Sequence, residues 1–220
     1  MTTTRHESLR ARLDRATKRH DILDHPFYRA WVEGTLTPAD LGVYAAQYRH
    51  HIDAFTGYLG ALAGRLEGTA QRAVADNLAD ERDGDHLALW DRFAGAVGAH
   101  DARRPTPETK ECVRTFAEGC EHRPVPFALG MIYGYESQTP SVATTKLQGL
   151  RERYGLDGAA VSYFDLHAQL DIEHSASLAA AIASTCRDES DLAVAEAGAE
   201  AGAAAVWKLL DGVERERAVA

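Results

Sequence analysis

The segment at residues 167–174, HAQLDIEH, constrains the fold more than any other part of the sequence, because it lies in the middle of a long predicted helix. At about 100° per residue, His167, Asp171 and His174 project from one stripe of that helix. Imidazoles and carboxylates are expensive to bury unless they are paired, hydrogen-bonded or bound to a metal. The segment therefore predicts a helical protein in which other helices supply partners for this stripe.

Composition narrows the class of protein. The chain has 220 residues, 45% of them hydrophobic, which is enough for one domain spanning residues 1–220. The net charge of −9 and the scattered Lys and Arg residues argue against a nucleic-acid partner. The sequence contains no signal-type apolar segment and no run approaching about 18 apolar residues, so we expect no membrane association and a cytoplasmic location.

The cysteines indicate neither a disulfide framework nor a structural zinc site. Cys112, Cys120 and Cys186 are odd in number and form no CxxC pair. We expect them to be buried, unreactive thiols.

Apolar residues recur at helical spacing along the chain, and no alternating strand pattern appears. Pro26 and Gly34 bound a short helix, and Thr37-Pro38 starts a long one. We predict an all-α bundle of about seven helices. The helical pattern covers residues 8–20, 26–34, 38–66, 69–97, 124–155, 158–184 and 189–216, with a shorter helix that ends near residue 120. ERDGD at 81–85 interrupts one pattern, and Pro140 should kink another.

Two other helices offer ligands for the His-Asp-His stripe. Glu136 lies in an otherwise apolar stretch just before Pro140, where a carboxylate requires a cation. Glu81 and His86 flank the interrupted turn. Their spacing suits one helix face only if Gly84 lets the helix unwind, and Asp83 is the alternative ligand.

Each of these features has a simpler explanation when taken alone. The stripe of residues 167–174 could be a polar flank, Glu136 could pair with an arginine, and the acidic turn could be solvated. Together, however, three helices supply three carboxylates and three imidazoles, the ligands that a dinuclear site in a helical bundle needs. His50 and His51 are either additional hydrogen-bond donors to this site or ordinary core and surface histidines.

The pattern of Glu81, His86, Glu136 and His-x-x-x-Asp-x-x-His resembles that of the heme-oxygenase-like dimetal oxidases. That family shares a seven-helix bundle with heme oxygenase and with TenA-like and PqqC-like proteins. Further stretches, including HPFYRAWVEGTLTPADL, DNLADE and YGYESQTP, are most similar to the para-aminobenzoate synthases of the chlamydial death-domain-associating type. The resemblance covers nearly the whole chain.

The resemblance implies a synthase that consumes its own side chains to supply folate biosynthesis. Tyr28 would be the aromatic source and Lys146 the amine donor, with Tyr135 and Tyr163 as aromatic neighbours of the metals. It further implies two iron ions, or one manganese and one iron, with O2 as co-substrate and an external reductant as partner.

Three other functions stay open at this point. One is an oxidase of the same family that acts on an external amino acid or fatty acid. The others are a metal-free TenA-like or PqqC-like enzyme and a non-enzymatic interaction protein. The turn between Glu81 and His86 is two residues shorter than expected for the synthase subgroup, which leaves Asp83 as an alternative ligand. The sequence does not decide whether the chain forms a homodimer.

Overall fold

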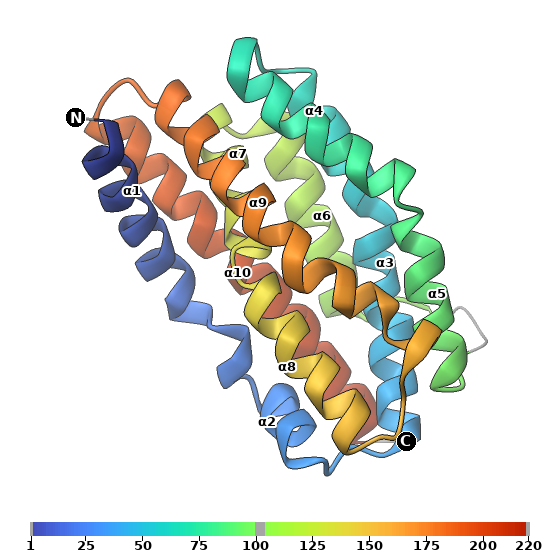
Figure 1. Ribbon diagram of the computed structural model, residues 1–220. Helices are drawn as coiled ribbons and strands as arrows, with labels where there is room; N and C mark the ends of the chain where they lie inside the picture. The colour runs from blue at the N-terminus through green and yellow to red at the C-terminus, as the bar shows by residue number, and fades with distance from the viewer. Residues whose placement is uncertain (1, 100–103, 219–220) are drawn as a thin grey trace.

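The computed structural model describes residues 2–99 and 104–218, and these residues contain helices and connecting loops but no β-strand (Figure 1). The α-helices are α1 (Thr2–Thr17), α2 (Pro26–Glu33), α3 (Pro38–Ala63), α4 (Gly68–Asp83), α5 (His86–Ala96), α6 (Pro107–His122), α7 (Val125–Glu136), α8 (Thr139–Glu152), α9 (Ser162–Thr185) and α10 (Glu189–Arg217). Short 3₁₀ helices are η1 (Lys18–His20), η2 (Ile22–Asp24) and η3 (Gly158–Ala160). The all-α class is as predicted.

The described residues form ten α-helices where about seven were predicted, and two of the expected long helices are each broken in two. The pattern at 69–97 breaks between α4 and α5, where Asp85 adopts a left-handed conformation with φ of 50°. The pattern at 124–155 breaks between α7 and α8, where Pro140 in the first turn of α8 has no N–H to continue the preceding helix. Each break lies beside predicted ligands, at Glu81 and His86 in one case and at Glu136 in the other.

Helices α7 and α10 approach each other more closely than side chains would allow. A Cβ atom on Gly130 or Gly134 would overlap the backbone of Ala195 or Ala199 in α10. Glycines of α10 lie against α7 in the same way. This backbone contact fixes α7 inside the bundle and thereby fixes the end of α7, where Glu136 lies.

Helix α9 crosses the bundle and packs against α4, α7 and α8 (Figure 1). A connected hydrophobic core includes residues from every α-helix, with Trp31, Trp90 and Phe116 among its largest buried side chains. The polar stripe of α9 therefore faces an interior lined by other helices. Among the described residues, no helix is long and apolar enough to cross a membrane.

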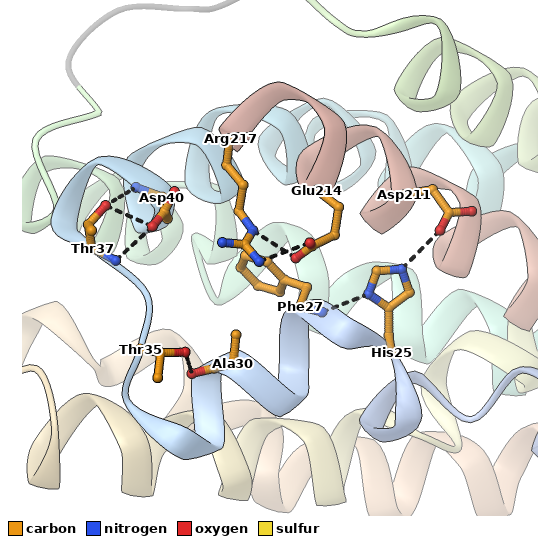
Figure 2. Close-up of polar contacts among 9 residues, drawn as sticks. All are labelled: His25, Phe27, Ala30, Thr35, Thr37, Asp40, Asp211, Glu214 and Arg217. Atoms are coloured by element: carbon orange, nitrogen blue, oxygen red, sulfur yellow. Dashed lines mark hydrogen bonds and ion pairs between the residues drawn. The ribbon is translucent and has the colours of Figure 1, made fainter. Parts of the chain in front are cut away.

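The short helix α2 is held at both ends (Figure 2). His25 is its N-cap, and its Nδ1 accepts a hydrogen bond from the backbone N–H of Phe27 at 3.1 Å. Its Nε2 lies 3.2 Å from Asp211 of α10, and Gly34 ends the helix with φ of 71°. Burial lowers the pKa of His25, which keeps the ring neutral so that Nδ1 can accept. These contacts fix the position of Tyr28, which α2 carries.

The close contact of α7 and α10 generates a prediction about stability. Gly134→Ala should lower the free energy of unfolding by about 1–3 kcal/mol, because its methyl group has no space against Ala199. Gly57→Ala on α3 is the matched control, since a Cβ there has no atom within 4 Å. It should be neutral or raise stability by up to about 1 kcal/mol. Urea denaturation measures both variants, and equal midpoints for the two would contradict the close packing.

Candidate metal centre

The six predicted ligands come from four helices that converge on one small pocket. Glu81 lies near the end of α4 and His86 starts α5, on either side of the break. Gly84 allows this arrangement, since a Cβ there would collide with the His86 ring. Glu136 is the last residue of α7, and α9 contributes His167, Asp171 and His174. The pocket is lined by four of the six, namely Glu81, Glu136, His167 and Asp171, together with Ile52, Phe55, Tyr135 and Tyr163.

Glu81, His86 and His167 form the first half of the cluster, with one ligand atom from each lying within 4.8 Å of the others. His86 Nδ1 is 2.9 Å from Glu81 Oε2, and His167 Nε2 is 3.6 Å from Glu81 Oε1. His167 Nδ1–H donates to the backbone oxygen of Tyr163 at 2.8 Å. A carbonyl can only accept, so in the neutral ring this bond fixes the tautomer and places the lone pair on Nε2, the atom that faces Glu81.

Glu136, Asp171 and His174 are the other three predicted ligands. Among the described residues only the first trio has ligand atoms all within 4.8 Å of one another, but Glu136 and Asp171 line the same pocket as Glu81 and His167. His174 Nδ1 lies 3.5 Å from Asp171 Oδ1, one helical turn away. All three side chains are buried, with at most 5% of each residue exposed. Asp83, the alternative ligand, is an exposed residue at the end of α4.

The donor set fits a cation because several buried polar atoms lack a hydrogen-bond partner. His86 Nδ1, Glu136 Oε2 and His174 Nδ1 are fully buried and unpaired. The two nitrogens lie near carboxylate oxygens without the geometry of a hydrogen bond. Buried polar atoms are normally satisfied, so such atoms need a ligand. Carboxylate oxygens and imidazole nitrogens are the donors that iron and manganese take.

The pKa shifts within the cluster also indicate a site for a cation. Burial and the neighbouring Asp171 raise the pKa of Glu136 to about 8, because two carboxylates share one apolar site. For Glu81, burial acts to raise the pKa, but the adjacent imidazoles of His167 and His86 outweigh it and lower the pKa to about 2. For His174, burial disfavours the protonated ring, but the neighbouring carboxylates of Asp171, Glu136 and Asp80 favour it more strongly and raise the pKa to about 9. A divalent cation would relieve both the repulsion and the burial.

A second pocket lies on the other side of Tyr135 and Tyr163. Its other lining residues are Ile22, Tyr48, Thr139, Val142, Ala143, Lys146 and Phe164. Because Tyr135 and Tyr163 line both pockets, they form the wall between Lys146 and the ligand cluster. The ring of Tyr163 stacks on His167 with ring centroids 4.0 Å apart.

Tyr28 and Lys146 meet within a buried group of aromatic rings. Lys146 Nζ donates a short hydrogen bond to the hydroxyl of Tyr44, which lies 3.3 Å from the hydroxyl of Tyr28. Lys146 Nζ is also 5.3 Å from the centre of the Tyr28 ring. Burial lowers the pKa of Lys146 to about 7 and raises the pKa of Tyr28 well above its usual 10. An amine that is about half neutral at pH 7, and largely neutral above it, therefore lies beside a neutral phenol.

Three residues near the site were not singled out in the sequence. Tyr44 connects Tyr28 to Lys146. Asn77 Nδ2 donates to Glu136 Oε1 at 2.7 Å, and Asp80 Oδ2 accepts from His174 Nε2 at 3.1 Å. Asn77 lies one helical turn before Glu81, and that spacing was the only signal that could have indicated it.

The remaining histidine and cysteine expectations concern the core. His51 is buried against Tyr135, with ring centroids 4.8 Å apart, and burial lowers its pKa to about 3. His51 is thus a neutral core histidine, and His50 is half-buried. The three cysteines are free and buried, as expected, and burial raises the pKa of each thiol.

Comparison with known proteins identifies relatives along most of the chain. Residues 43–207 match the family model described as "Iron-containing redox enzyme". The 4-aminobenzoate synthase of Chlamydia muridarum is 36% identical over 187 residues, which cover 81% of this chain and 79% of that protein. The 4-aminobenzoate synthase of Nitrosomonas europaea is 34% identical and covers 94% of this chain and 91% of that protein.

Solved structures show the same fold at low sequence identity. A TenA homologue from Pseudomonas syringae superposes with a TM-score of 0.80 at 15% identity, over 95% of this chain and 92% of that one. A domain of unknown function with a heme oxygenase-like fold from Shewanella denitrificans gives 0.79 at 17% identity, over 100% and 94%. The fold is heme-oxygenase-like, and the chain belongs to the family of iron-containing redox enzymes.

Proposed function

We propose that this enzyme makes 4-aminobenzoate from its own Tyr28 and Lys146, with O2 as oxidant and a dinuclear metal centre. One observation carries the proposal: a buried lysine amine lies 5.3 Å from the ring of a buried tyrosine, next to a cluster of buried metal-type ligands. The relatives named 4-aminobenzoate synthase support the same function.

The chemistry of tyrosine suits this product. A tyrosine ring carries the β-carbon para to oxygen, and 4-aminobenzoate carries a carboxyl group para to nitrogen. The conversion breaks the Cα–Cβ bond of Tyr28 and oxidises Cβ to the carboxylate, whose oxygens come from O2 or water. The nitrogen of Lys146 bonds to the ring carbon, and the phenol oxygen leaves as water. Oxidation at Cε to an imine and hydrolysis of that imine then break the Cε–N bond, which frees the aromatic amine and leaves an aldehyde at residue 146. O2 accepts the electrons of the oxidation, and an external reductant supplies any further electrons that the reduction of O2 requires.

The protein's own residues prepare the two reactants. Burial lowers the pKa of the Lys146 amine to about 7, so that much of it is neutral at that pH and its lone pair is available as a nucleophile. Tyr44 binds that amine and lies within reach of the Tyr28 hydroxyl, which orients the amine toward the ring. The surrounding rings of Tyr48 and Phe164 exclude water from the amine.

The metal would be held by Glu81, His86 and His167 on one side and by Glu136, Asp171 and His174 on the other. Two iron ions, or one manganese and one iron, would supply the redox chemistry that activates O2. Tyr163, stacked on His167, and Tyr135 would connect this centre electronically with the pocket of Lys146.

Mass spectrometry of the intact protein tests the self-consuming reaction. After anaerobic loading with Fe²⁺ and Mn²⁺ and exposure to O2 with a reductant, we expect loss of the Tyr28 side chain, a modified Lys146 and one aminobenzoate per chain at most. Peptide mapping locates both changes. Tyr28→Phe and Lys146→Arg should release no aminobenzoate.

Matched controls separate this reaction from general damage. Tyr133→Phe removes another buried tyrosine hydroxyl, which bonds Asp14, and Lys208→Arg changes an exposed lysine paired with Glu111. Both should retain product formation. If Tyr28→Phe still consumes O2 at the wild-type rate when an amino acid or fatty acid is added, that result would instead support an oxidase that acts on external substrates.

Metal loading tests the ligand set. His167→Ala or Asp171→Ala should lose bound iron and manganese, because each removes a buried ligand from the centre of the cluster. Elemental analysis after anaerobic loading and desalting measures the effect. His122→Ala removes an exposed imidazole and should load normally. Full occupancy in either ligand variant would refute the assignment.

The pH dependence tests the role of the amine. The protein is loaded with metal at one fixed pH and is then moved to a range of reaction pH values before O2 is added. Product should form faster as the reaction pH rises through about 7. The same pKa shift makes stability depend on pH. Between about pH 7 and 10.5 the native state holds Lys146 largely neutral, while the unfolded state still binds the proton. The free energy of unfolding should therefore rise with pH between about 7 and 10.5. A rate that falls across pH 7, with no such stability gain relative to Lys146→Met, would contradict a neutral amine.

A further inference from the structure

Helix α4 contributes more than the ligand Glu81 to the cluster. Two other residues of the same helix, Asn77 and Asp80, each form a hydrogen bond with a predicted ligand on another helix. Asn77 Nδ2 donates to Glu136 Oε1 of α7 at 2.7 Å, and Asp80 Oδ2 accepts from His174 Nε2 of α9 at 3.1 Å. The three residues lie within one turn of α4, at positions i, i+3 and i+4.

Glu136 and His174 each have a second polar atom that forms no hydrogen bond. Glu136 Oε2 and His174 Nδ1 are both buried and unpaired, while the other polar atom of each side chain is bonded to α4. A carboxylate can only accept, so Nε2–H of His174 donates to Asp80, and in the neutral ring the lone pair is on Nδ1. The lone pair is on the nitrogen that lies 3.5 Å from Asp171.

From this pairing we infer that Asn77 and Asp80 are positioning residues that aim Oε2 of Glu136 and Nδ1 of His174 at a divalent cation. The inference rests on the proposed function, because it assumes that Glu136, Asp171 and His174 bind metal. Asp80 and His174 then form the carboxylate–histidine pair that typically fixes the tautomer and raises the basicity of a metal-binding imidazole. Asn77 leaves Glu136 with one free oxygen, so the carboxylate should bind through that oxygen alone.

Titration with Mn²⁺ alone tests Asp80, since binding is measured without turnover. The electron paramagnetic resonance signal of free Mn²⁺ reports how many ions the protein takes up and how tightly. Wild type should bind two ions. Asp80→Ala should weaken one of them by about ten- to a hundredfold, the usual effect of losing a partner of a metal-binding histidine, and should leave the other unchanged. Asp80→Glu should restore most of the loss.

Asp76→Ala provides the matched control, because Asp76 is an exposed acid on the same helix. It removes the same charge without contact to His174 and should bind both ions as wild type does. The side chain of Asp80 is 54% exposed, so Asp80→Ala should fold, and its urea midpoint without metal checks this. Asn77→Ala should weaken the same ion as Asp80→Ala does.

A crystal structure of the Mn²⁺-loaded protein tests the atoms directly. Nδ1 of His174 and Oε2 of Glu136 should face the ion, with Nε2 still on Asp80. Coordination through Nε2, or wild-type affinity for both ions in Asp80→Ala, would overturn the inference and leave the proposed function standing. A wild-type protein that binds fewer than two ions would refute the dinuclear site itself.

Discussion

Burial of several carboxylates and imidazoles in one apolar bundle is the constraint on which the rest of this structure depends. Glu136, Asp171 and His174 are almost fully buried, and unpaired charges in such a place are strongly destabilising. The protein supplies only part of the compensation: some polar atoms bond to each other, and others remain without partners. A cation between them would satisfy both the charge and the open lone pairs. Membership of an iron-containing redox enzyme family agrees with that interpretation.

A left-handed residue, two helix breaks and a close contact between two helix backbones together position the buried ligands. The left-handed Asp85 and the break after α4 turn His86 back toward Glu81. The break after α7 ends that helix at Glu136. The glycine contacts between α7 and α10 bring two backbones together without side chains between them, and thus hold α7 where its last residue reaches α4 and α9. The left-handed Asp85 and the two helix breaks lie next to residues of the cluster, as is common at functional sites.

Much of the fold follows from local rules that can be read in the sequence. Proline at a helix start and glycine at a helix end correctly bounded α2, and Thr37 with Pro38 correctly started α3, because capping chemistry depends only on neighbouring residues. The number of helices was not predictable in the same way. Whether Pro140 kinks a helix or ends it depends on what packs around the break. The spacing of His167, Asp171 and His174 fixed one face of α9, but not what lies opposite.

The sequence by itself determined the helical class, the ligand stripe of α9 and the residue types available to oppose it, since these depend on periodicity and composition. Tertiary structure alone decided which atoms meet. Lys146 reaches Tyr44, and Asp80 reaches His174, across separations of 102 and 94 residues that no helical period can encode. It also decided protonation, because the pKa of Lys146 falls to about 7 only when packed rings remove water from its amine. Contacts between distant segments and the desolvation they produce are properties of the packed bundle, which is why they appear only when the helices are assembled.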